Sequence, residues 1–342
     1  MLHLLQTFLQ RHRRRLLLLL AAVLLAAAVI SIHGALSRVR AQQAQAAASG
    51  SGLIASPVSA YREITYCNGT ATLSFALDET GRWYWADDPD FPLDQSYPLR
   101  MVDTLAAIQP QQTITEAEPL ENYGLDEPSH TLTAIAGNGL TFSLALGKTT
   151  TDGDSYYMLM NGASKPVYII SDELAREMAV GIYEMYVLPE ITALPEEQIA
   201  SITISGAADV TLTAIHTEAA EGETPATTWR SSGANVTDDP QVQRILAQVL
   251  APELDGCVDY RPSDGAISLC GFDEPDAVIS VRYASGGTVE TRTLTVGART
   301  LAEDGRYVRI DDDPTIYRMN TDRLDAVMPA AAEGLGGSAA AD

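Results

Sequence analysis

The sequence predicts an α+β fold, with two tandem copies of an antiparallel-sheet-plus-helix module after one N-terminal transmembrane helix. Three observations predict it. Residues 16–36 form an apolar run, and a six-residue motif recurs 147 positions after its first copy. Short runs of alternating polarity, typical of half-buried antiparallel strands, surround both copies. Helices that cover one face of such sheets make the fold α+β rather than doubly wound.

The N-terminal segment predicts a membrane anchor. Residues 16–32 contain one polar residue, Ser31, and an arginine-rich cluster at 11–15 directly precedes them. About 20 apolar residues span the hydrocarbon core as a helix, and the positive-inside rule keeps the basic end in the cytoplasm. We therefore predict a cytoplasmic segment at 1–15, a single-pass signal anchor in the lipid bilayer at 16–36, and an extracytoplasmic stalk at 37–59. A cleaved signal peptide is the alternative.

The charge of the chain limits its partners. The formal net charge is −23, yet the first 40 residues contain six arginines and no acid, so the remainder is more acidic than this total. Such a surface repels phosphate groups, which argues against nucleic acid as a partner. It also favours solubility.

An internal repeat organises the rest of the chain. The motif Tyr123–Pro128 (YGLDEP) matches Cys270–Pro275 (CGFDEP), and a predicted β-hairpin follows each copy, with glycines in its turn. Each hairpin precedes a tyrosine-centred strand, a further short strand, and a helix start at 171–174 or 321–324. We therefore predict a first module at 60–180, a connector at 181–198, a second module at 199–329 and a disordered tail at 330–342.

The first halves of the two modules also correspond. Strands are predicted at Ile64–Cys67, Thr72–Leu77 and 83–85 in the first module, and at 202–204, 210–215 and around Trp229 in the second. A helix follows in each. The second, Pro240–Leu250, has one apolar face, whereas the first, Pro98–Ile108, has a weaker stripe of Val102, Leu105 and Ala106.

The repeated motif predicts a structural turn. Glycine permits a positive φ, the apolar residue after it can enter the core, and proline fixes the chain before the next strand. Binding of a ligand by the motif is the alternative. The residues concerned are Gly124, Leu125, Asp126 and Pro128 in the first copy and Gly271, Phe272, Asp273 and Pro275 in the second.

Aromatic residues at corresponding places suggest a second hypothesis. Trp83 and Trp85 share one face of a predicted strand, and Trp229 occupies the matching strand of the second module. Core packing explains them simply. The alternative is an exposed aromatic patch that binds a partner protein or a glycan.

No residue pattern predicts catalysis, a cofactor or a metal. His130 and His216 fall in different modules, outside any zinc-ligand spacing. Cys67, Cys257 and Cys270 form no C-x-x-C pair; Cys257 and Cys270 either form a disulfide or remain free. Asp-rich stretches lack the spacing of a calcium loop, and no two acids stand out as a glycosidase pair.

The order of these motifs resembles the domain of unknown function 4340 family. The resemblance rests on an N-terminal membrane segment, Gly-Arg-Trp-Tyr-Trp at 81–85, the motif at 123–128, and Leu-Gly-Lys at 146–148. It covers about 60–190 and, in degenerate form, about 200–330. It implies a membrane-anchored exported bacterial protein, often beside ABC-type transporters of the gliding-motility kind, and it implies no catalytic residues.

The function we expect is that of a non-enzymatic extracytoplasmic scaffold or binding module, accessory to an ABC-type transporter or a cell-envelope complex. Permease and ATPase subunits are then the candidate partners. An envelope polysaccharide or peptidoglycan hydrolase is one alternative, and a ligand-sensing ectodomain is another.

Overall fold

The computed structural model of the protein describes residues 61–217 and 226–335. They form two units: unit 1 takes residues 61–90 and 95–180, and unit 2 takes 91–94, 181–217 and 226–335. The predicted cytoplasmic segment (1–15), anchor (16–36) and stalk (37–59) lie outside the described residues. Within them, no helix is long and apolar enough to cross a membrane.

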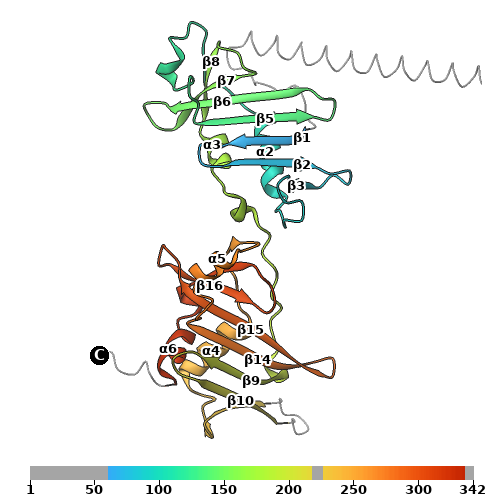
Figure 1. The fold of residues 1–342 in the computed structure, drawn as a ribbon, viewed down its shortest axis with the longest axis vertical. Coiled ribbons are helices and arrows are strands. Elements are labelled where there is room, and N and C mark those ends of the chain that lie inside the picture. The colour runs from blue at the N-terminus through green and yellow to red at the C-terminus, as the bar shows by residue number, and fades with distance from the viewer. Residues whose placement is uncertain (1–60, 218–225, 336–342) are drawn as a thin grey trace, which may run out of the picture. The chain divides into compact units, whose positions relative to one another are not determined.

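Unit 1 is built on an eight-stranded antiparallel sheet with the order β3-β2-β1-β5-β6-β7-β8-β4 (Figure 1). Leu132, Ala134 and Ala136 alternate along β5 toward the core, and the residues between them stay partly exposed, as expected for a sheet with one buried face. The strands are β1 (Tyr61–Cys67), β2 (Thr72–Leu77), β3 (Trp83–Trp85), β4 (Gln112–Ile114), β5 (His130–Ala136), β6 (Thr141–Thr149), β7 (Ser155–Met160) and β8 (Val167–Ser171).

Unit 2 is built on a nine-stranded antiparallel sheet with the order β12-β11-β10-β9-β14-β15-β16-β17-β13. Ala277, Ile279 and Val281 of β14 point into its core in the same alternating way. The strands are β9 (Ile199–Ser205), β10 (Val210–Thr217), β11 (Ala226–Ser231), β12 (Ala234–Asn235), β13 (Gly256–Asp259), β14 (Ala277–Ser285), β15 (Thr288–Arg299), β16 (Gly305–Ile310) and β17 (Ile316–Asn320).

The two strand orders correspond strand for strand once the short edge strand β12 is set aside. In both sheets the hairpin after the repeated motif (β5–β6, β14–β15) lies beside the first strand of the unit (β1, β9). The sheets are antiparallel and carry helices on one face (Figure 1). The predicted α+β fold class is therefore confirmed.

The helix predicted at Pro240–Leu250 is α4, with these bounds. Asp239 caps it by accepting a hydrogen bond from the Gln241 backbone N–H. In unit 1 the corresponding helix, α2 (Ser96–Ala106), buries Pro98, Met101 and Leu105. The predicted stripe of Val102, Leu105 and Ala106 was therefore wrong at two positions, because Met101 and Pro98 set the buried face.

The helix starts predicted after the last strands differ between the units. In unit 1, α3 (Glu173–Met178) begins as expected, but Asp172 makes no cap with its side chain, which instead pairs with Arg176. In unit 2, residues 321–324 give only a 3-10 turn, η4 (Thr321–Arg323), and the α-helix α6 (Val327–Glu333) starts later. The predicted helix start at 321–324 is therefore a 3-10 turn, and the α-helix that follows it begins only at Val327.

Two predicted boundary segments are part of unit 2. Residues 181–198, predicted as a connector, contain the 3-10 helices η2 (Ile182–Met185) and η3 (Glu196–Gln198), and Leu194 joins the core. The predicted tail begins inside α6, where Ala330 and Ala331 are buried. Alanine favours helix and is small enough to lie against the β9–β10 turn, where Ala208 donates to the Ala331 carbonyl.

Unit 2 also includes the four residues Phe91–Asp94, which precede α2 in the chain. The Phe91 ring lies 5.5 Å from the rings of Tyr186 and Tyr260. Backbone hydrogen bonds join Asp94 to Met185 at 2.8 Å. Unit 2 is therefore discontinuous in sequence, which the repeat did not predict.

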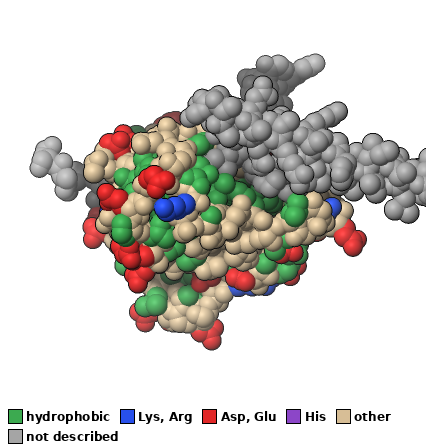
Figure 2. All heavy atoms as spheres, turned by 90° about the horizontal axis from the view of Figure 1, so that it is seen from above, with side chains coloured by type: hydrophobic (Ala, Val, Ile, Leu, Met, Phe, Trp, Pro, Cys, Tyr) green, Lys and Arg blue, Asp and Glu red, His purple; other side chains and the backbone are tan. Residues whose placement is uncertain are grey.

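The surface is acidic, as the composition requires. On the face drawn in Figure 2, acidic side chains are scattered and basic ones are few. Ion pairs within the described residues, such as Lys165–Glu116, Arg176–Asp172 and Arg244–Asp325, join mostly exposed side chains. Exposed pairs contribute little to stability, so we expect the two apolar cores to hold the fold.

Candidate functional site

Unit 1 has a cleft of about 560 Å³ where the end of α2, the loop after it, and the junction of β8 with α3 meet. Its lining is mostly polar, with two carboxylates and no Lys or Arg. The lining residues are Asp103, Thr104, Ala107, Ile108, Gln109, Gln111, Ile170, Ser171, Glu173 and Leu174.

Unit 2 has a cleft of about 440 Å³ between the end of α4, the loop after it, and the junction of β17 with η4. Its lining contains two carboxylates, Glu253 and Asp322, and one arginine, Arg323. The lining residues are Ala247, Gln248, Ala251, Glu253, Met319, Asn320, Asp322 and Arg323.

The two clefts lie at corresponding places. From α2 to Gln111 and from α4 to Asp255 the chain has the same length, and both stretches end on the same type of hydrogen bond. The Gln111 backbone N–H donates to Ile169 of β8 at 2.7 Å, and that of Asp255 donates to Arg318 of β17 at 2.8 Å. Eight positions of the two linings therefore correspond, whereas the counterparts of Ile108 and Gln111 do not line the cleft of unit 2, and only Ala107 and Ala251 are identical.

In unit 1, two side chains of the lining form hydrogen bonds with residues that do not line the cleft, Ser155 and Glu177. Gln111 Oε1 accepts from the buried Ser155 hydroxyl at 2.9 Å. Thr104 Oγ1 donates to Glu177 Oε1 at 3.0 Å. Burial raises the pKa of Glu177, and the acids Glu173 and Asp103 raise it further. The cleft is therefore a region of excess negative charge.

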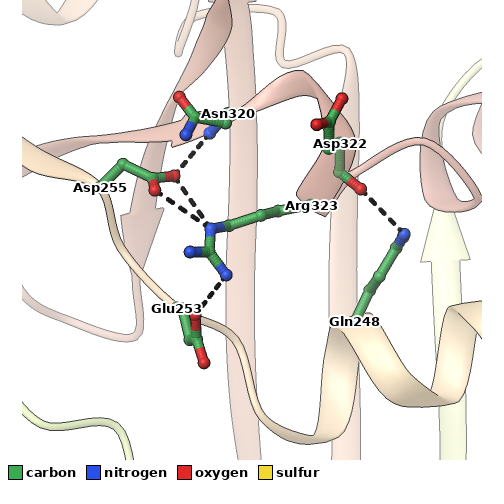
Figure 3. A network of polar contacts seen from close by, with 6 residues as sticks. All are labelled: Gln248, Glu253, Asp255, Asn320, Asp322 and Arg323. Carbon is green, nitrogen blue, oxygen red and sulfur yellow. Dashed lines mark hydrogen bonds and ion pairs between the residues drawn. The ribbon is translucent and has the colours of Figure 1, made fainter.

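In unit 2, the corresponding polar groups satisfy one another (Figure 3). Arg323 Nε donates to both carboxylate oxygens of Asp255, at 3.1 and 3.2 Å, and Arg323 Nη1 pairs with Glu253. Asp255 also accepts from the Asn320 backbone N–H at 2.7 Å. These charge-assisted bonds tie the loop after α4 to the end of β17.

The repeated motif forms a turn of the same geometry in both units. The Leu125 N–H donates to the Leu120 carbonyl at 3.0 Å and the Phe272 N–H to the Ile267 carbonyl at 3.2 Å. Gly124 and Gly271, with φ of 65° and 81°, provide the left-handed residue that this helix-ending turn requires. Asp126 and Asp273 are exposed, and Pro128 and Pro275 lead into β5 and β14 without lining either cleft.

The tryptophans do not form the exposed patch considered from the sequence. Trp83 is 3% exposed and Trp229 is 0% exposed. The Trp229 indole donates to Glu196 Oε1 at 2.6 Å, which satisfies its polar atom on burial. Trp85 is partly exposed, and one side chain does not make an aromatic patch. The patch hypothesis is therefore wrong for Trp83 and Trp229, which fill the cores.

The remaining candidate groups are dispersed. Cys67, Cys257 and Cys270 are free thiols, and burial raises the pKa of Cys257 to about 12, so this thiol stays protonated at neutral pH. His216 contacts the Ile199 carbonyl and the Thr227 hydroxyl. Across residues 61–217 and 226–335, no three His, Cys, Asp or Glu side chains are placed to hold a metal ion.

The chain is similar to one known family. Residues 83–226 match the model described as Domain of unknown function (DUF4340). No curated protein and no solved structure matches the chain. The matched region contains the motif turn at Gly124 and the whole unit 1 cleft.

Proposed function

Residues 83–226 belong to the domain of unknown function 4340 family, and on that premise we propose that this protein is an extracytoplasmic, membrane-anchored scaffold or binding module without enzymatic activity. Its partner is an ABC-type transporter or another cell-envelope complex. The anchor at 16–36 and the arginine cluster before it support this location.

The observation that carries the proposal is the pair of corresponding clefts. We propose that the two units are copies of one module, at 60–180 and 199–329, because their strand orders correspond and their clefts lie on the same elements. The two copies share the strand order of the sheet but differ in the residues that line the cleft. A chain with two related but chemically different clefts suits the simultaneous binding of two different groups better than the conversion of one substrate.

Co-purification tests the proposal. The full-length chain is isolated from its own membranes in mild detergent after chemical crosslinking, and the bound proteins are identified by mass spectrometry. We expect a permease and its ATPase to be recovered. The control is a chain in which four leucines of 16–36 are replaced by serine, because a polar span should not insert and should lose these partners.

The outcome that contradicts the proposal is also specific. The same purified protein is incubated with peptidoglycan and envelope polysaccharide, and released fragments are measured. Turnover that one acid-to-amide substitution abolishes, without recovery of transporter subunits, would establish the hydrolase alternative instead. Stabilisation of the protein by a soluble ligand alone would favour the sensor alternative.

A further inference from the structure

The guanidinium group of Arg323 occupies the cleft of unit 2. Its guanidinium lies against Asp255 and Glu253, with Nε 3.1 and 3.2 Å from the two Asp255 oxygens. The side chain of Asp255 is only 13% exposed, whereas that of Arg323 is 37% exposed. A planar guanidinium matches carboxylate acceptors in this geometry. The cleft of unit 2 therefore already contains a cationic group, supplied by its own chain.

The corresponding position in unit 1 carries no cation. Leu174 follows the end of β8 by three residues, as Arg323 follows the end of β17. It is 2% exposed and packed into the core. The positions of Glu253 and Asp255 are taken by Gln109 and Gln111, whose side-chain oxygens also accept hydrogen bonds. Gln111 Oε1 already accepts one hydrogen bond, from the Ser155 hydroxyl, but no guanidinium group lines the cleft of unit 1.

Unit 1 adds negative charge around the same space. Asp103 replaces Ala247 of unit 2, and Glu173 corresponds to Asp322, so two carboxylates line a cleft that contains no Lys or Arg. A third carboxylate, Glu177, bonds to the lining residue Thr104 through Oε1. Its Oε2 is buried and has no hydrogen-bond partner within the described residues.

Arg100, a basic side chain that acts on Glu177, lies on α2 one turn before Thr104. Its guanidinium lies 4.4 Å from the centre of the Tyr97 ring and donates to Ser96 Oγ. It favours the ionised form of Glu177, although the burial of Glu177 outweighs this effect. Arg100 does not line the cleft, and so it leaves the acceptors there open.

We propose that the cleft of unit 1 binds the guanidinium group of an arginine side chain presented by a partner protein. Asp103 and Glu173 provide the charge, and Gln109, Gln111 and Ser171 provide hydrogen-bond acceptors. The proposal rests on the correspondence of the two modules in the proposed function, and it deepens that function by naming the group that is bound. One side chain in an open cleft binds weakly, with a Kd on the order of 1 mM.

The test uses a single arginine as the probe. N-acetyl-arginine amide is titrated into the full-length protein in detergent micelles, and binding is followed by saturation-transfer NMR of the probe. N-acetyl-citrulline amide is the matched control, because it has nearly the same shape without the charge. We expect binding of the arginine probe, and at least fivefold weaker binding of the citrulline probe.

Two variants locate the site. The double variant Asp103→Asn and Glu173→Gln should weaken arginine binding at least fivefold, whereas Asp322→Asn, the counterpart of Glu173 in unit 2, should leave it unchanged. All three side chains are exposed, so the thermal unfolding midpoint should hold within about 2 °C. Equal losses in both variants would show delocalised attraction by an acidic chain and overturn the proposal.

Two further results would overturn the proposal: equal binding of the citrulline probe, and unchanged binding by the double variant. Either leaves the scaffold function open, since that function is measured separately by recovery of the permease and ATPase. Conversely, arginine binding without recovery of transporter subunits would support the arginine site in the cleft and would reject the transporter as the partner.

Discussion

Two glycines outside the repeated motif hold its turn in place. Gly147 in β6 and Gly297 in β15 lie where the pairing with the next strand shifts register. A Cβ on Gly147 would lie 2.1 Å from the Tyr123 carbonyl oxygen, and one on Gly297 would lie 2.2 Å from that of Cys270. The motif turn therefore packs directly against the backbone of the strand, at a point where the strand has no side chain. The strand glycine and the motif turn depend on each other for this close contact.

Replacing either glycine should destabilise its unit. Gly147→Ala and Gly297→Ala place a methyl group inside a backbone contact, and we expect each to cost about 2–3 kcal/mol of unfolding free energy. Urea denaturation measures this loss. Gly181→Ala is the control, because its Cβ would meet nothing within 4 Å; a loss as large for Gly181→Ala would remove the steric explanation.

Glu177 should make unit 1 less stable as the pH rises. Burial raises its pKa in the folded state, with Glu173 and Asp103 adding to the effect. A raised carboxyl pKa means that folding favours the protonated form, so stability is full below the unfolded pKa and falls as the pH rises through the folded pKa. Glu177→Gln should therefore raise the unfolding midpoint at pH 7 and change it little at pH 4.

The comparison variant for Glu177 is Glu127→Gln, which removes the same charge from an exposed turn. Thermal unfolding of the three proteins between pH 4 and pH 7 measures the effect. A Glu177→Gln curve parallel to that of the unsubstituted protein would show that the burial of this carboxylate has no energetic consequence.

At the scale of elements, Arg323 joins the loop after α4 to the end of β17 through Asp255 and Glu253. Arg323→Ala leaves the mostly buried Asp255 with the Asn320 N–H as its remaining partner, and we expect a loss of about 1–2 kcal/mol. Methylguanidine at millimolar concentration should restore part of it. The free energy of unfolding, measured with and without methylguanidine, checks both expectations.

The control for Arg323 is Arg318→Ala. Arg318 pairs with Asp304 at 3.5 Å, and both side chains are about half exposed, so its loss should cost at most about 0.5 kcal/mol. Equal losses in the two variants, or no response to methylguanidine, would contradict a guanidinium site in this cleft.

Elements with a strong local signal could be predicted from the sequence. The apolar face and the proline start of α4 fixed its bounds, and alternating polarity located β5 and β14. Where the signal came from packing, prediction failed. Met101 rather than Val102 is buried in the core of unit 1, and residues 321–323 form a 3-10 turn rather than the first turn of an α-helix.

The clefts could not be predicted for a related reason. Each is lined by two short segments that lie 59 positions apart in unit 1 and 66 in unit 2, and the corresponding linings share almost no residues. The tryptophans mislead in the opposite direction: they stand out in the sequence, yet Trp83 and Trp229 fill the cores. A residue-by-residue alignment of α2 with α4 and of β8 with β17 would have been needed to place both clefts from the sequence repeat.

At the scale of the whole molecule, the four residues Phe91–Asp94 tie the stability of unit 2 to the first half of the chain. Phe91 is 2% exposed, so Phe91→Ala should cost about 3–5 kcal/mol. The effect should fall on unit 2, with faster amide exchange at Tyr183–Val187 and unchanged exchange in β1 and β5.

Phe142→Ala provides the mirror control, because Phe142 is equally buried but lies in the core of unit 1. Hydrogen exchange read by mass spectrometry should then show the reverse pattern. Faster exchange of β1 and β5 in Phe91→Ala would contradict the assignment of this segment to unit 2.

The position of Phe91 also has a consequence for biosynthesis. Its partner Tyr260 is 169 residues further along the chain, so a ribosome adding about 5–20 residues per second makes Tyr260 roughly 10–30 s after Phe91. The aromatic cluster of Phe91, Tyr186 and Tyr260 cannot be complete before that time. We therefore expect the segment Phe91–Asp94 to become protected from proteases only after the chain has been made as far as Tyr260.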